Sequence, residues 1–206
     1  MKMSMEGLTG SLFEEETIPV NQQEWPMEKY GELMKERKFE EARAVELRWV
    51  LDQKIVSSRA EWYQMKPEER TNTVLEWFKN HQPDVLDPYD PRAPNGILRA
   101  LWESVLKIIA KESGGKETVD LYSTLHSMPD SCYGIDAFLD VNGINFSLDV
   151  TLNRSKLDHK ADMILRPDML LGYDEEIDPI KVESVARIIV DRIKRRKKAS
   201  TAQLVA

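Results

Sequence analysis

The sequence predicts an α+β fold in which a mixed β-sheet with a central β-hairpin is flanked by helices and preceded by an α-helical N-terminal region. Three observations lead to this class. Residues 135–152 alternate between apolar and polar side chains around Asn142-Gly143, as a hairpin does. Apolar side chains recur at helical spacing both before and after this hairpin. Residues 83–96 contain four prolines and separate the helical part from the mixed part.

The hairpin has a predictable register. Asn142-Gly143 is the preferred dipeptide of a two-residue type I′ turn, because both of its positions require φ > 0. Such a turn pairs Val141 with Ile144. On one apolar face it then sets Leu139 opposite Phe146, Ala137 opposite Leu148, and Ile135 opposite Val150. On the other face it sets Asp140 opposite Asn145, Phe138 opposite Ser147, and Asp136 opposite Asp149.

The opposed pair Asp136 and Asp149 is the feature with most chemical content. Directly opposed side chains have Cβ atoms about 4.5–5.5 Å apart, and like charges at that separation are destabilising. A divalent cation between the carboxylates would turn this cost into a binding site. Two other interpretations remain open. The aspartates are solvated residues on a wet sheet face, or they protect an edge strand from aggregation. A bulge would shift the register and separate the pair.

The chain divides into five segments by pattern. Residues 1–24 contain Glu14, Glu15 and Glu16 and are expected to form a mobile acidic tail. The helical N-terminal region is expected over 25–82, the Pro/Asp-rich linker over 83–96, the α+β domain over 97–198, and a mobile tail over 199–206.

The elements within these segments follow from local signals. A helical pattern over 27–55 contains a tight helix-turn-helix within 33–42, and Pro67 opens a helix that runs to Asn80. A broad apolar face predicts a helix over 97–112, which stops at Gly114-Gly115. Strands are expected over 118–126 and 161–166. The last helix has Asp178 as its N-cap and Pro179 at its first position.

Composition limits the class of protein. The 206 residues are 41% hydrophobic and 32% charged, which is ordinary for a globular chain. No apolar run is long enough to span a bilayer, and the N-terminus lacks the apolar region of a secretory signal. The single cysteine, Cys132, excludes an internal disulfide framework and fits a reducing compartment. We therefore expect a cytoplasmic protein with no membrane partner.

Charge is distributed unevenly along the chain. The net charge is −7, which argues against nonspecific nucleic-acid binding by the whole surface. The last helix nevertheless ends in a basic run, in which the residues that would contact phosphate are Arg192, Lys194, Arg195, Arg196, Lys197 and Lys198. The alternative is that these cations complement the negative end of the helix macrodipole.

A helix, a strand and then a hairpin with two carboxylates resemble the PD-(D/E)XK, or restriction-endonuclease-like, nuclease superfamily. In that family an acidic residue on one strand and a second on its neighbour bind Mg²⁺, and the second lies in a D/E-x-K tripeptide. The resemblance covers about residues 97–170. It implies that Asp136 and Asp149 are the metal ligands, with the backbone carbonyl of Val150 as a further ligand and Glu103 as a glutamate from the preceding helix.

One position departs from the family pattern. Thr151 stands where the family has its lysine, in Asp149-Val150-Thr151. Lys156 or Lys160, just beyond the strand, would then supply the ammonium group. The resemblance implies metal-assisted hydrolysis of phosphodiester bonds with Mg²⁺ or Mn²⁺, and a nucleic acid as the substrate.

Two functions without catalysis compete with the nuclease. The first is a protein-interaction module on a similar fold, which the missing lysine and the acidic surface favour. Its partner surface would lie in the helical N-terminal region, whose tryptophans we expect more often in the core than at an interface: Trp25, Trp49, Trp62 and Trp77. The second is a nucleic-acid-binding protein that relies on the basic run alone.

Overall fold

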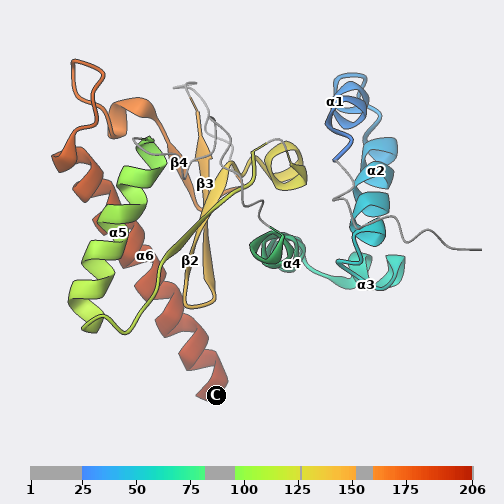
Figure 1. Cartoon of the computed structure of the whole chain (residues 1–206). Helices are drawn as coiled ribbons and strands as arrows, with labels where there is room; N and C mark the ends of the chain where they lie inside the picture. Colours follow the sequence, from blue (N-terminus) through green and yellow to red (C-terminus); the bar gives the residue numbers. More distant parts are fainter. Residues whose placement is uncertain (1–24, 82–95, 126, 152–159, 206) are drawn as a thin grey trace, which may run out of the picture.

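The computed structural model describes residues 25–81, 96–125, 127–151 and 160–205, with side chains as far as Ala199. The predicted α+β class is confirmed. Helices α5 (Ile97–Ser113) and α6 (Pro179–Val205) cover one face of a four-stranded sheet in this part of the chain. Helix α4 (Pro67–Asn80) and the π-helix η1 (Pro129–Tyr133) cover the other face, as Figure 1 shows. No helix among these residues is both long and apolar enough to cross a membrane.

The N-terminal region forms helices as predicted, with one addition. The expected helix-turn-helix corresponds to α1 (Met27–Lys35) and α2 (Phe39–Asp52). The helix that Pro67 opens ends at Asn80, as its pattern indicates. The short helix α3 (Arg59–Gln64) was not predicted, and the Ser58 side chain caps its first turn.

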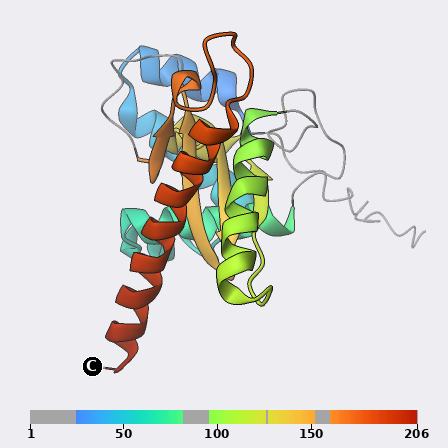
Figure 2. The ribbon, with the colours of Figure 1, turned by 90° about the vertical axis from the view of Figure 1, so that its left-hand side faces the viewer.

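The sheet is mixed, in the order β1-β2-β3-β4. Strands β1 (Asp120–Ser123), β2 (Ala137–Val141) and β3 (Ile144–Val150) are antiparallel neighbours, and β4 (Met163–Leu165) pairs parallel to β3. The two outer strands are shorter than predicted. Helix α6 extends beyond the sheet in Figure 2 and continues to Val205, so it includes most of the segment that was expected to be a tail.

The predicted turn and the register near it are confirmed. Asn142 and Gly143 have φ values of 51° and 82°, as a type I′ turn requires. The Gly143 N–H donates to the Asp140 carboxylate at 2.6 Å, which fixes the turn further. All five predicted pairs from Val141–Ile144 to Ala137–Leu148 are present.

Beyond Ala137 the predicted register is wrong, because the strand bulges. The Asp136 N–H donates to the Leu148 carbonyl at 2.9 Å, although Leu148 is already the partner of Ala137. Two residues of one strand therefore oppose one residue of the other, which defines a bulge. As a result Asp136 and Asp149 are not a ladder pair. Ile135 turns away from Val150 and packs in a cluster with Phe138 and Leu75.

The apolar faces of the sheet and helices form the main core. Leu139, Phe146 and Leu148 are fully buried, as the alternation predicts, against the apolar stripes of α5 and α6. A second core lies within the helical region and includes Trp25, Trp49 and Trp62. These three tryptophans are therefore core residues, as we expected, and the fourth, Trp77, is partly buried and packs against the same core.

The second face of the sheet is covered rather than wet. Phe138, Ser147 and Asp149 are 0%, 6% and 3% exposed. The residues above them come from α4 and η1, and Leu75 of α4 packs directly with Phe138. Because Cys132 of η1 and Met128, the residue that precedes η1, belong to the helical core, the N-terminal region and the sheet share one packed boundary.

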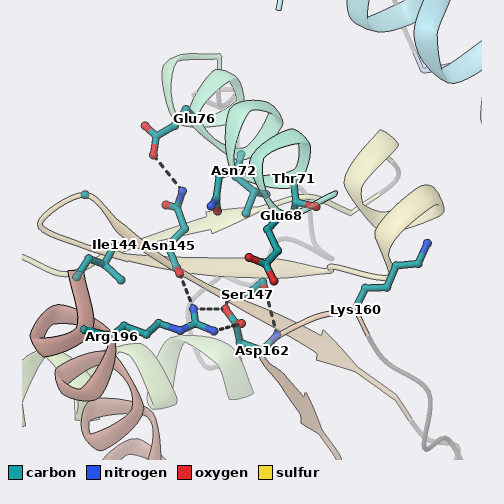
Figure 3. Close-up of a pocket in the computed structure, with 13 residues that line it drawn as sticks. Glu68, Thr71, Asn72, Glu76, Ile144, Asn145, Ser147, Lys160, Asp162 and Arg196 are labelled. Atoms are coloured by element: carbon teal, nitrogen blue, oxygen red, sulfur yellow. Dashed lines mark hydrogen bonds and ion pairs between the residues drawn. The ribbon is translucent and has the colours of Figure 1, made fainter. Parts of the chain in front are cut away.

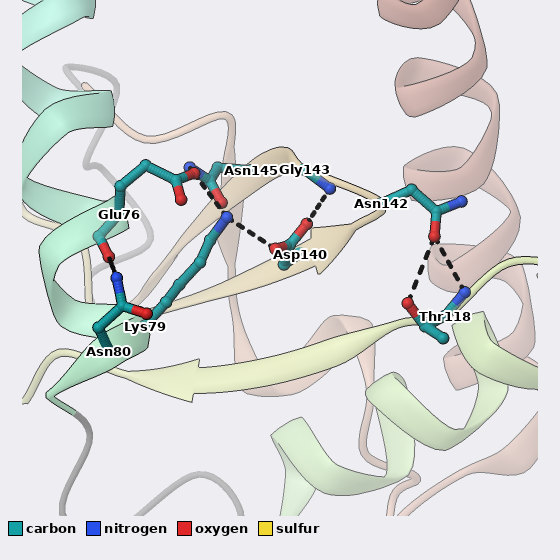
Figure 4. A network of polar contacts seen from close by, with 8 residues as sticks. All are labelled: Glu76, Lys79, Asn80, Thr118, Asp140, Asn142, Gly143 and Asn145. Carbon is teal, nitrogen blue, oxygen red and sulfur yellow. Dashed lines mark hydrogen bonds and ion pairs between the residues drawn. The ribbon is translucent and has the colours of Figure 1, made fainter.

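Lys79 joins this boundary to the tip of the hairpin (Figure 4). Its ammonium lies 2.6 Å from the Asp140 carboxylate and 2.5 Å from that of Glu76, and its side chain is 10% exposed. Burial alone would lower the pKa of Lys79, but the hydrogen bonds of the two carboxylates outweigh it and raise this pKa. The cation also offsets like-charge repulsion, because β1 pairs Asp120 with Asp140.

We predict that Lys79→Met lowers the free energy of unfolding by about 2–4 kcal/mol, because it leaves Asp140 largely buried without its cation. Urea unfolding followed by circular dichroism measures the change. Lys29→Met, which removes a charge from the exposed side of α1, is the control and should change stability by about 0.5 kcal/mol or less. Equal effects of the two substitutions would contradict the role of Lys79.

Candidate active site

Asp149 is the most buried acidic residue of the described chain, with 3% of its surface exposed. It lies near the end of β3, where Asn145, Ser147 and Asp149 alternate with Phe146 and Leu148 of the main core. Its carboxylate therefore faces the side of the sheet that α4 and η1 cover. Removing a carboxylate from water is costly unless a charge or hydrogen bonds compensate it.

Asp136 is held beside this strand by both its backbone and its side chain. Its N–H donates to the Leu148 carbonyl, and its own carbonyl accepts from the Thr124 N–H, both at 2.9 Å. Its Oδ2 accepts the N–H of Val150 at 2.5 Å. The carboxylate thus reaches the residue that directly follows Asp149. The bulge separates the predicted ladder pair but keeps both aspartates at the same end of the hairpin.

The π-helix η1 leads the chain into this position. It ends at Gly134, whose φ of 61° is in the left-handed region that favours glycine. The Thr124 hydroxyl then donates to the Ile135 carbonyl, so the backbone just before Asp136 is fixed on the β1 side as well. Single-turn π-helices occur often at functional sites.

The chemistry of this end of the sheet fits a hard divalent cation. The two carboxylates and the Val150 carbonyl would all be oxygen ligands. Mg²⁺ commonly binds one or two carboxylates and keeps several waters. Within the described ranges, no group of three or more Asp, Glu, His or Cys side chains is placed to hold a metal ion. The pair would therefore need water or substrate oxygens to complete the coordination.

Glu103, the predicted third carboxylate, is not brought to this end of the sheet. Helix α5 buries Leu101 and Val105, so Glu103 points away from the sheet, with 57% of its side chain exposed. It pairs with Arg99 at 3.0 Å and lines an outer groove between α5 and α6. The sheet lies between this groove and the face that carries Asp149.

Of the two lysines predicted to supply the ammonium group, only Lys160 lies within the described residues. Lys156 lies outside the described residues. Lys160 is on the α4 side of the sheet, where its ammonium donates to the Cys132 carbonyl at 2.8 Å and lies 5.8 Å from the centre of the Tyr133 ring. An ammonium has three donors, and this bond uses one. Thr151, at the position of the family lysine, donates its N–H to the Leu165 carbonyl at 3.0 Å.

Most of the basic run on α6 makes contacts within the protein. Lys194 pairs with Glu112 at 2.6 Å and Lys197 with Glu117 at 2.7 Å. Arg192 donates to the Asp162 carbonyl, and Arg196 pairs with the Asp162 carboxylate. The other two members, Arg195 and Lys198, are exposed and pair with no acid in the described part of the chain.

Asp162 is a site residue that the sequence did not reveal. Its carboxylate accepts the Ser147 N–H at 2.8 Å, and its own N–H donates to the Ser147 hydroxyl at 2.9 Å. Arg196 binds both oxygens of this carboxylate, and the hydrogen bonds raise the pKa of Arg196. Nothing local marks this contact, because Asp162 and Arg196 are 34 residues apart.

A polar cavity of about 710 Å³ lies between α4, the hairpin and the C-terminal part of α6 (Figure 3). Ser147 on its floor is two residues before Asp149 on the same face of β3. The charged and amide side chains that line the cavity are Glu68, Asn72, Glu76, Asn145, Lys160, Asp162 and Arg196.

Comparison with known proteins gives no matching family model, no similar curated protein and no similar solved structure.

We predict that Arg196→Ala lowers the free energy of unfolding by about 1–3 kcal/mol, because it leaves Asp162 without its charged partner. The neighbouring Arg195→Ala removes the same type of side chain from an exposed position that has no ion pair with any described residue, and it should change stability by about 0.5 kcal/mol or less. Chemical unfolding of the two variants decides the matter. Equal stability of the two proteins would contradict the structural role of Arg196.

Proposed function

We propose that the protein is a divergent metal-dependent nuclease that hydrolyses phosphodiester bonds of nucleic acid. The observation that carries the proposal is the burial of Asp149 at the end of the hairpin where the Asp136 carboxylate accepts the N–H of the next residue, Val150. Two carboxylates at one end of a strand pair repel each other, and this repulsion costs stability. A divalent cation offsets this cost, and the two oxygen ligands suit Mg²⁺ or Mn²⁺.

Each residue has a role in this proposal. Asp136 and Asp149 hold the cation, and the Val150 N–H bond keeps the Asp136 carboxylate in place. A divalent cation held by these two carboxylates would supply Lewis-acid chemistry, which polarises a phosphate and lowers the pKa of a bound water. Lys160 uses its remaining N–H donors to neutralise charge that develops on the phosphate oxygens. The water oxygen bonds to phosphorus and gives up one proton to solvent. The bond from phosphorus to the leaving oxygen breaks, and solvent protonates that oxygen.

The basic run has a smaller part in this proposal than its sequence indicates. Since Arg192, Lys194, Arg196 and Lys197 contact groups of the protein, nucleic-acid backbone contact from α6 rests on Arg195 and Lys198. Substrate binding should therefore show only a shallow dependence on salt.

The proposal is tested by a cleavage assay with Mg²⁺ and with Mn²⁺ on single- and double-stranded DNA and RNA. We expect Asp149→Asn to lower the cleavage rate about 100-fold or more, since the loss of a charged ligand weakens the cation site. Asp191→Asn removes a carboxylate from the exposed side of α6 and should cleave at the wild-type rate. Circular dichroism confirms that both variants are folded.

Two outcomes would overturn the proposal. One is wild-type protein that is folded but cleaves none of these substrates with either metal. The other is cleavage that Asp149→Asn leaves unchanged. The first outcome would favour a protein-interaction module on this fold.

A further inference from the structure

The polar cavity and the two aspartates occupy one side of the sheet. Strand β3 runs from Asn145 through Ser147, both in the cavity wall, to Asp149, and two residues of a strand span about 6.6–6.8 Å. Lys160 also lines the cavity, while its ammonium binds the Cys132 carbonyl of η1. Figure 3 shows Lys160 beyond Ser147, on the side away from Asn145. The cavity therefore leads from the tip of the hairpin toward the candidate active site.

Several polar groups in the cavity wall are already committed to one another. Asn145 donates to Glu76 at 3.0 Å, and Glu76 pairs with Lys79. The Asp162 carboxylate is bound by Arg196 and by the Ser147 N–H. These bonds make a rigid wall, but they leave these groups little capacity for a ligand.

Two groups on α4 are open to a ligand. Glu68, Asn72 and Glu76 are four residues apart, so they form one row along the helix above the cavity. The Glu68 carboxylate and the Asn72 amide are exposed and make no hydrogen bond with any residue in the described ranges. The buried side chain of Leu75 and the partly buried Ile144 add apolar surface to the wall.

The Glu68 carboxylate and the Asn72 amide determine which ligand groups can bind in the cavity. A carboxylate accepts hydrogen bonds, and an amide both donates and accepts them. Three carboxylates line the cavity, Glu68, Glu76 and Asp162, so a phosphate is disfavoured except near the two cations of the lining, Lys160 and Arg196. A nucleobase is planar, uncharged and apolar on its faces, and its amino groups donate hydrogen bonds to carboxylates. The volume of about 710 Å³ suits a ligand of nucleotide size.

We propose that this cavity binds one unpaired, amino-bearing base of the substrate, whose phosphate then lies toward Lys160 and the two aspartates. The inference rests on the proposed function and adds the substrate class, a single-stranded or flipped nucleotide. Glu68 is the specificity-determining residue. Guanine is preferred, because its pairing edge carries two adjacent N–H donors that one carboxylate accepts together. Thymine, with a single ring N–H donor between two carbonyls, binds least well.

Fluorescence anisotropy in EDTA tests the proposal without cleavage. The probes are fluorescein-labelled twelve-residue oligothymidylate and the same strand with one central guanine, cytosine or adenine. We expect the full-length wild-type protein to bind the guanine strand about tenfold more tightly than oligothymidylate. Glu68→Gln should reduce this preference to about twofold or less, and Glu32→Gln, an exposed glutamate of α1, should retain it. Annealing the complementary strand should abolish the preference.

Three results would overturn the inference: equal binding of all four strands, a preference that Glu68→Gln leaves intact, or no binding of any strand. These failures are distinguishable from failure of the proposed function. Metal-dependent cleavage without base preference would contradict the proposed base pocket but agree with the proposed nuclease activity. Base-selective binding by a protein that cleaves none of the substrates would contradict the proposed nuclease activity but agree with the proposed base pocket.

Discussion

The hydrogen bond from the Val150 N–H to the Asp136 carboxylate is the contact on which the candidate site depends. The Asn142-Gly143 turn pairs the hairpin as far as Ala137 and Leu148, and the bulge then ends the regular ladder. Beyond the bulge a side-chain oxygen accepts the strand's N–H at 2.5 Å. This substitution places the Asp136 carboxylate at the strand that carries Asp149, so a departure from regular pairing builds the site.

The helical N-terminal region packs against the sheet and contributes contacts to the hairpin. Helix α4 covers the polar face of the hairpin, and Lys79 pairs with Asp140 near the hairpin turn. Helix α2 reaches η1 through the Tyr133 hydroxyl, which donates to Glu46 at 3.1 Å. Burial raises the pKa of Glu46 and outweighs this hydrogen bond, which lowers it. Burial also raises the pKa of the Cys132 thiol to about 12.

This arrangement has a consequence for Cys132. A thiol with so high a pKa is protonated at neutral pH, so it is a poor nucleophile and acts here as a packed core group. Its backbone carbonyl, by contrast, holds the Lys160 ammonium. The contact of Cys132 with the candidate site is therefore made by its backbone carbonyl and not by its thiol.

The sequence predicts those features that depend on neighbouring residues. The turn at Asn142-Gly143, the start of α4 at Pro67 and the start of α6 at Pro179 follow from residue types that favour one backbone conformation. Alternation along β2 and β3 predicts which side chains enter the main core. These signals are local, and no tertiary contact overrides them.

The features that were missed depend on contacts distant in sequence. The bulge at Asp136 is not encoded in the alternation, which continues through it, and η1 has no periodic signal. Glu103 lies on the helix where a carboxylate was expected, but the side of α5 that meets the sheet decides its direction. Arg196 reads as part of a basic run, and only the fold shows that Asp162 binds it.

The proposed function requires that Asp136 and Asp149 together hold a divalent cation at the end of the hairpin. Anomalous X-ray diffraction from crystals of the protein grown with Mn²⁺ tests it most directly. We expect an anomalous peak about 2.0–2.6 Å from a carboxylate oxygen of each aspartate, and the loss of this peak in Asp149→Asn. A map without a peak at these carboxylates in wild-type crystals, or a peak that persists in Asp149→Asn, would contradict the claim.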